Sequence, residues 1–328
     1  MDRRNHSSGV LLVLAAGLLW GTVGPAQVLA GPSAAPVAVG GARILSGGLV
    51  LAVLVLAADR RAFLALTRRT WPPLLAASAA TGTFQASFFS AVDRTGAAVA
   101  TAVVFGLAPV STGLCERLVL GSRLGRRWWA GTACAVGGVA LLMVPGESVR
   151  ADPAGIALGL LGGTCFGVYT VSAKVLTGPR GGAGGLGGTR MAAAVSVTLL
   201  AGGAALLPWT LPELPALAAP RPAALVAWLG IATTAAAYMF FVTGLGRVPA
   251  ATAGTLGLAE PLVAAGLAVA VLGERMPAPV AAGSLLLMGG LFLVSVPARA
   301  PRGDAPARYD GGHATGAVKV ESTTGERK

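Results

Sequence analysis

An acidic residue, Glu260, lies in the middle of the apolar stretch GLAEPLVAAGLAVAVLGERM, residues 257–276. A charge at the centre of a membrane helix costs at least about 2.5 kcal/mol, so such a residue faces the protein interior or water, or is protonated. Pro261 follows it and removes a backbone donor, which should break the helical turn and free the carbonyl of Gly257. A carboxylate beside a broken turn can bind a cation or carry a proton. It can equally be a structural acid that bonds to a neighbouring helix.

Aromatic and polar side chains share faces on several other apolar stretches, as Ser78 and Thr81 do at helical spacing. Such faces can line a cavity that holds an amphipathic solute by apolar contact and a few hydrogen bonds. They can also be ordinary packing, because Ser and Thr bond across membrane helices and buried rings fill space. The candidate binding residues are Trp20, Gln85, Phe88, Thr101, Phe105, Tyr169, Tyr238, Phe241 and Glu260.

The elements that must position these residues are long and apolar. Of the 328 residues 54% are hydrophobic and 12% are charged, with a mean hydropathy of +0.73, whereas soluble domains carry about 25% charged residues. Stretches of roughly 20 apolar residues are long enough to cross about 30 Å of hydrocarbon as helices. We therefore exclude a water-soluble domain and predict an all-α integral membrane protein with ten transmembrane helices, in contact with the lipid bilayer. The predicted spans are residues 10–30, 36–57, 72–92, 97–116, 128–145, 153–175, 186–207, 222–244, 249–272 and 278–297.

The basic residues form short clusters between these stretches. A net charge of +12 is compatible with nucleic-acid binding, but this distribution follows the positive-inside bias of membrane proteins, so we expect no nucleic-acid partner. We place both termini in the cytoplasm of a multi-pass protein of the cell membrane, with residues 298–328 as a disordered cytoplasmic tail. Glu116 and Arg117, where a span meets the cytoplasm, should form an interfacial pair. The outer loops then keep only Arg94, Arg150, Arg221 and Arg275.

The chain contains two copies of a five-span unit, residues 1–149 and 150–297. Pro109 pairs with Pro261, and the same separation relates several glycines of the two copies. Because five is odd, the second copy must enter the membrane from the opposite side, which gives the inverted repeats typical of secondary transporters. We assign both prolines a structural or gating role and predict a broken turn in each copy, although only the second copy has an acid beside it. The repeat also predicts that the first span, which resembles a secretory signal, is retained.

Two arginines, Arg43 and Arg190, occupy matching positions in the motifs GGAR and GGTR of the two copies. Long basic side chains near helix ends usually reach back to the interface or cap carbonyls. Their symmetry therefore favours a structural or gating role. Arg43 could instead neutralise Glu260 or the carboxylate of a bound solute.

The sequence resembles the EamA-type transporters of the drug/metabolite transporter superfamily. The resemblance covers residues 10–297 and rests on LLWG at 18–21, followed by Pro36 and Arg43, on LGER at 272–275, and on a repeated G..GG pattern. It implies a ten-helix carrier with cytoplasmic termini and a central cavity. It also implies export of amino acids, metabolites or toxic compounds.

The leading hypothesis is a gradient-driven or facilitative carrier without enzyme activity, cofactor or metal. No histidine or aspartate lies in a predicted span, so the usual serine–histidine and di-aspartate catalytic arrangements are missing. The sequence also lacks the phosphate-binding motif G-x-x-x-x-G-K-[ST] of ATP-driven pumps. A passive channel or a membrane scaffold is the alternative. The substrate, the direction of transport, a coupling proton and the formation of a homodimer stay open.

Overall fold

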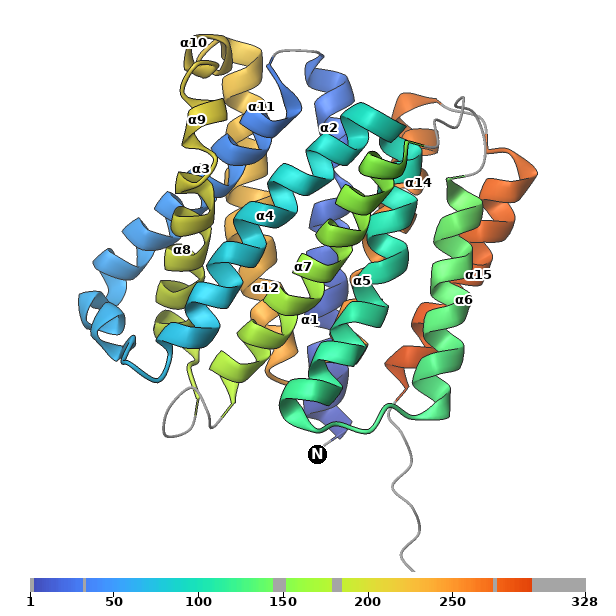
Figure 1. The fold of residues 1–328 in the computed structure, drawn as a ribbon, viewed down its shortest axis with the longest axis horizontal. Coiled ribbons are helices and arrows are strands. Elements are labelled where there is room, and N and C mark those ends of the chain that lie inside the picture. Colours follow the sequence, from blue (N-terminus) through green and yellow to red (C-terminus); the bar gives the residue numbers. More distant parts are fainter. Residues whose placement is uncertain (1–2, 32–33, 144–151, 179–184, 274–275, 297–328) are drawn as a thin grey trace, which may run out of the picture. The chain divides into compact units, whose positions relative to one another are not determined.

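The computed structural model describes residues 3–31, 34–143, 152–178, 185–273 and 276–296, and these stretches contain helices but no strands (Figure 1). The predicted tail at 298–328 lies outside the described residues, as do Arg150 and Arg275. In the first half the helices are α1 (Arg3–Gly21), α2 (Val23–Ala30), α3 (Pro36–Asp59), the 3-10 helix η1 (Arg60–Ala65), α4 (Trp71–Thr95), α5 (Ala97–Leu120) and α6 (Arg126–Leu142).

The second half begins with α7 (Pro153–Thr177) and α8 (Gly188–Ala204), and two short helices lead from α8 to the next long segment. That segment changes from α-helix to π-helix and back. The remaining elements are α9 (Leu207–Thr210), α10 (Leu214–Leu217), α11 (Pro220–Gly230), the π-helix η3 (Ile231–Ala236), α12 (Ala237–Leu245), α13 (Ala250–Leu256), α14 (Ala259–Leu272) and α15 (Ala278–Ser295).

Helices overlap each predicted span, and seven helical segments of the described residues are long and apolar enough to cross a membrane. These segments are Arg4–Ala30, Pro36–Leu64, Ala97–Leu120, Pro153–Thr177, Pro220–Leu245, Ala250–Leu272 and Ala278–Ser295. α6 and α8 have 17 residues each, which gives about 26 Å of helix, slightly less than the hydrocarbon core. α4 is longer but less apolar, because it carries the serine, threonine and glutamine residues of the predicted polar face.

The main helix contacts join the two halves. α1 packs against α12 and α14, whereas its counterpart α7 packs against α4 and α5. α3 pairs with α8, and α6 pairs with α15, as Figure 1 shows at the two sides of the bundle. In the repeat, α4 corresponds to the segment that ends with α12, and α5 corresponds to α13 and α14. Exchanging each helix for its counterpart therefore reproduces these main contacts. In Figure 1 α1 starts near the marked N-terminus and α7 starts at the opposite end of the bundle.

Glycines bring α6 and α15 into close contact. A Cβ added at Gly138 would lie 2.6 Å from the backbone N of Leu287 and 2.7 Å from the carbonyl O of Gly283. Gly283 shows the reciprocal contact, 2.7 Å from the carbonyl O of Gly138. Small residues that let backbones approach are the usual means of packing helices in membranes. Their role here is packing rather than chemistry.

We expect Gly138→Ala to lower stability by about 1–3 kcal/mol, because the added Cβ meets backbone atoms that cannot rotate away. Thermal unfolding of the purified protein in detergent would measure the change. Gly137→Ala is the matched control, since its Cβ would meet only the end of the Leu286 side chain at 3.5 Å. Equal effects of the two substitutions would contradict a close contact at Gly138.

The predicted broken turn is present in one copy only. The second copy is interrupted at Gly257 and Leu258, between α13 and α14, whereas α5 runs without interruption through Pro109. The prediction of a break in both copies is therefore wrong. The second copy has a glycine at the interruption where the first has Phe105, and glycine weakens a helix by about 1 kcal/mol relative to alanine. The carbonyl of Gly257 is not left free, because the backbone N–H of Glu260 donates to it at 3.1 Å.

Candidate functional site

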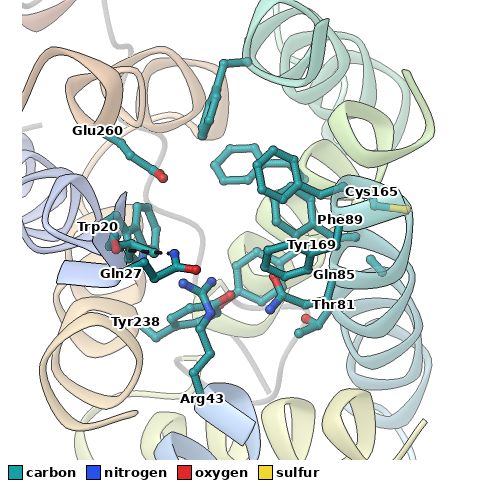
Figure 2. A pocket seen from close by; sticks show the side chains of 16 residues that line it. Trp20, Gln27, Arg43, Thr81, Gln85, Phe89, Cys165, Tyr169, Tyr238 and Glu260 are labelled. Atoms are coloured by element: carbon teal, nitrogen blue, oxygen red, sulfur yellow. Dashed lines mark hydrogen bonds between the residues drawn. The ribbon is translucent and has the colours of Figure 1, made fainter. Parts of the chain in front are cut away.

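A cavity lies between the two halves, in the middle of the bundle. The space open to the centres of water-sized molecules is about 100 Å³, many times the roughly 10–15 Å³ that one buried water needs. Seven helices, α1, α2, α3, α4, α5, α7 and α12, and the start of α14 contribute to its wall. The lining residues are Trp20, Val23, Gln27, Arg43, Ala80, Thr81, Phe84, Gln85, Phe88, Phe89, Phe105, Cys165, Phe166, Tyr169, Tyr238 and Glu260 (Figure 2).

Two charged side chains of opposite sign face this space. Figure 2 shows Glu260 and Arg43 pointing into the cavity from different walls. They form no ion pair with each other in the described structure. The Nε atom of Arg43 is buried and has no hydrogen-bond partner. Because a buried polar group without a partner costs about 1–3 kcal/mol, this atom is suited to receive a ligand or water.

The interruption between α13 and α14 explains the position of Glu260. On an ideal continuous helix, Thr255 would lie about 140° away from Glu260 around the axis. In the structure Thr255 bonds instead to Thr132 of α6, with 2.8 Å between the two hydroxyl oxygens, while Glu260 lines the cavity. Thr255 therefore contacts α6, whereas Glu260 faces the cavity. Only the acid belongs to the cavity.

Aromatic rings form much of the remaining wall. The centroids of Trp20 and Tyr238 are 5.7 Å apart, and those of Tyr238 and Tyr169 are 5.5 Å apart, both edge to face. On α4, Phe84 and Phe88 stack with centroids 5.9 Å apart. The hydroxyl of Tyr169 is buried without a hydrogen-bond partner. Ring faces, a free hydroxyl and two opposite charges together suit a small solute with an apolar body and charged ends.

The polar face of α4 combines structural bonds with cavity contacts. Gln85 is buried, and its Nε2 donates to the carbonyl of Gly40 on α3 at 3.1 Å. The hydroxyl of Thr81 donates to the carbonyl of Ala77 at 2.8 Å, one turn earlier in α4. The bond to Gly40 fixes α4 beside the turn of α3 that carries Arg43. Gln85 therefore helps to position the arginine as well as lining the cavity.

The structure brings most of the predicted binding residues together, but two lie elsewhere. Phe241 is fully buried behind the wall, with its ring 5.3 Å from that of Trp20, because the aromatic face of α12 is used for packing at this level. Thr101 is partly exposed on α5 and does not line the cavity. The residues that do line it are Trp20, Gln85, Phe88, Phe105, Tyr169, Tyr238 and Glu260.

The two symmetric arginines have different surroundings. Arg43 lines the cavity, whereas Arg190 is exposed in the first turn of α8. Pro109 and Pro261 are buried but do not contribute to the cavity wall. Equivalent sequence positions thus have unlike environments, so the sequence symmetry alone does not decide the role of Arg43.

Several lining residues were missed from the sequence. Phe84 lies on the same face of α4 as Phe88, and Phe166 is the repeat counterpart of Trp20. Helical spacing and the repeat could therefore have identified both. Gln27 is an amide inside an apolar stretch, and its Nε2 donates to the carbonyl of Val23 at 3.3 Å. A polar amide in a membrane helix should face the protein interior, so this signal could have identified Gln27.

A helical membrane bundle with a central polar and aromatic cavity is the arrangement found in membrane transport proteins. The model of the EamA-like transporter family matches the chain twice, over residues 7–144 and 153–296, so the chain belongs to this family. The double match follows the two halves of the chain.

Two bacterial relatives extend over most of the chain. An uncharacterized transporter, YwfM, of Bacillus subtilis (strain 168) is 35% identical over 292 residues, which are 89% of this chain and 94% of the relative. An uncharacterized protein, PA1977, of Pseudomonas aeruginosa is 30% identical over 259 residues, 78% of this chain and 82% of the relative. A solved crystal structure that is 21% identical covers 88% of this chain and 96% of that chain, with a TM-score of 0.71. At this level of identity the likeness concerns the fold.

Proposed function

We propose that this protein is a secondary transporter that exports a small amphipathic solute through the cell membrane by alternating access. The observation that carries the proposal is the central cavity, where Arg43 and Glu260 face a common space walled by aromatic rings. Secondary transporters bind substrate and coupling ions near the middle of the bilayer, at the interface between their repeats. The name of the relative YwfM, a transporter, supports this reading.

The proposed architecture has ten membrane crossings in two inverted halves, residues 1–149 and 150–297. The contact pattern supports it, since exchanging the halves exchanges α1 with α7 while the pairs α3–α8 and α6–α15 map onto themselves. Rocking one half against the other would expose the cavity alternately to the two sides. Such a cycle needs no chemical step on the solute.

The proposed orientation places both ends of the chain in the cytoplasm. Connections at the end of the bundle where α1 begins carry most of the described basic residues, whereas Arg94 and Arg221 lie at the opposite end. This asymmetry follows the positive-inside rule. At the opposite end Arg94 and Asp152 form a salt bridge of 3.2 Å. Bonds from the backbone N–H of Ala154 and from Arg94 lower the pKa of Asp152.

The proposed substrate is a zwitterion with an apolar body, such as an amino acid or a related metabolite. Arg43 would bind its carboxylate, Glu260 its ammonium group, and the rings of Trp20 and Tyr238 its apolar part. Charge-assisted hydrogen bonds of this kind are the stronger ones in proteins. Glu260 can hold either a proton or an ammonium group at one time, and this competition would couple solute movement to a proton moving the opposite way.

Transport in reconstituted liposomes tests the proposal. Liposomes loaded with unlabelled leucine or phenylalanine should take up the labelled compound transiently above its external concentration, because a carrier exchanges one bound solute for another. Uptake should also saturate. Linear uptake without counterflow would indicate a passive channel. If this panel shows neither, comparing metabolites in medium and cytosol with and without the protein would identify a solute, and no difference there would contradict a carrier.

A further inference from the structure

A short buried helix leads from one end of the bundle to the segment that carries Glu260. We call this end, where α1 begins, the N-terminal end (Figure 1). Every residue of α13 (Ala250–Leu256) is buried, and none of them lines the cavity. α13 starts near the beginning of α1, because Arg247, which precedes it, donates to the hydroxyl of Ser8 at 3.0 Å. We therefore interpret α13 as the helix between the cavity and the surface at the N-terminal end.

Two side chains of the first half hold the first turn of α13. The carboxylate of Glu116, on α5, accepts hydrogen bonds from the backbone N–H groups of Ala250 at 3.1 Å and Ala251 at 2.6 Å. The indole N–H of Trp128, on α6, donates to the carbonyl O of Ala251 at 2.9 Å. Glu116 is only 3% exposed. It is thus a buried helix cap, and the predicted interfacial pair with Arg117 is wrong because both carboxylate oxygens face α13.

The residues that precede α13 are held from within the second half. The ammonium group of Lys174, on α7, donates to the carbonyls of Leu245 at 2.6 Å and Val248 at 2.7 Å. This fixes the connection between α12 and α13. The bonds of Glu116 and Trp128 are different, because they cross from one half of the protein to the other and must break if the halves separate at this end.

The contacts of Glu116 and Trp128 have no counterpart at the opposite end. The repeat places Ala268 at the position of Glu116 and Val280 at the position of Trp128. Neither side chain can form such hydrogen bonds. Among the described residues, Arg94 and Asp152 also join the two halves at the opposite end, but their salt bridge is exposed to water. The bonds of Glu116 and Trp128 to α13 are buried, and surface ion pairs contribute little to stability.

We propose that Glu116 and Trp128 form a latch that keeps the N-terminal end closed, and that this end opens when α13 moves away at the interruption formed by Gly257 and Leu258. The latch rests on the proposed carrier function. It biases the protein without solute toward the conformation in which the cavity is open only at the opposite end. Release of the latch is then a required step of the transport cycle.

Two reporter cysteines test the latch in a background where Cys115, Cys134 and Cys165 are replaced by serine. Thr252→Cys reports opening at α13, because Thr252 is buried in the structure. Gln27→Cys reports opening of the opposite end, because Gln27 lines the cavity from α2, which lies at that end (Figure 1). The rate of maleimide labelling is measured in lipid nanodiscs, where the reagent reaches both ends and no substrate is needed.

Glu116→Gln should raise the labelling rate at Thr252→Cys by about ten-fold. The glutamine side chain is uncharged, so its hydrogen bonds are weaker, and its amide NH2 group would face a backbone N–H that it cannot accept from. Trp128→Phe, which loses only the indole N–H bond, should raise it by about three-fold. Trp129→Phe is the matched control, since Trp129 is half exposed. Labelling at Gln27→Cys should fall in the two latch variants, whereas unfolding would raise labelling at both reporters.

Unchanged labelling at Thr252→Cys in both latch variants would overturn the latch, and so would a parallel rise at both reporters. If Glu116→Gln does not fold, Trp128→Phe decides the question alone. The outcome is separable from the transport assay. If counterflow occurs but labelling does not change, the protein is a carrier without this latch. If labelling changes but counterflow is absent, the latch exists in a protein that is not a carrier.

Discussion

In liposomes with an imposed pH gradient, Glu260→Gln is expected to abolish solute accumulation. Solute exchange should persist but need a higher solute concentration, because the ammonium group loses its charged partner. In the proposed cycle Glu260 binds the solute's ammonium group on the alkaline side and releases it on the acidic side, where the carboxylate is protonated. The solute therefore accumulates on the acidic side. One proton per solute would support up to about ten-fold accumulation for each unit of pH difference, since a ten-fold ratio corresponds to about 1.4 kcal/mol. Glutamine takes up no proton, so the ratio should fall to about one.

Two further variants separate proton coupling from a structural role of Glu260. Glu260→Asp keeps a carboxylate in the cavity and should retain accumulation. Glu213→Gln removes a carboxylate that lies between α9 and α10, outside the cavity, and should behave like the unchanged protein. If Glu260→Gln accumulates solute as well as the unchanged protein does, Glu260 carries no coupling proton and belongs to the structural framework.

The sequence was most informative where apolar length and internal repetition determine structure. Helices overlap each predicted span, because uninterrupted apolar stretches have few alternatives in a bilayer. The cavity was anticipated through Glu260, Gln85 and Tyr169, since polar groups in apolar helices must face the protein interior. These inferences need only the burial of polar groups and the periodicity of a helix.

The roles of individual side chains depended on contacts between distant segments. Glu116 resembled an interfacial acid because its local sequence ends an apolar stretch, but its partners lie 134 and 135 residues later in the chain. Phe241 shares a helix with Tyr238, yet a ring on the next turn packs behind the wall instead of lining it. Local periodicity identifies the inward face of a helix. The neighbouring helices determine whether a residue on that face lines the cavity or packs behind its wall.

Arg43→Gln is expected to weaken binding of a solute that carries a carboxylate by about 10- to 100-fold, because a hydrogen bond to a charged group contributes about 1.5–3 kcal/mol. The variant removes the cation whose buried Nε has no protein partner. The concentration that gives half-maximal counterflow would measure the change. Arg190→Gln is the matched control, since it changes the repeat counterpart, which is exposed and does not line the cavity.

Solutes that differ in charge can distinguish a binding role of Arg43 from a structural one. If Arg43 binds the carboxylate, the unchanged protein should prefer an amino acid over its amide, and Arg43→Gln should remove that preference because both solutes then meet a neutral side chain. A structural arginine would weaken both solutes equally and preserve the preference. Arg43→Lys should give an intermediate result, since an ammonium group keeps the charge but cannot offer the paired donors of a guanidinium. The opposed placement of Arg43 and Glu260 then predicts that a second preference, for ammonium over neutral solutes, survives in Arg43→Gln and is lost in Glu260→Gln.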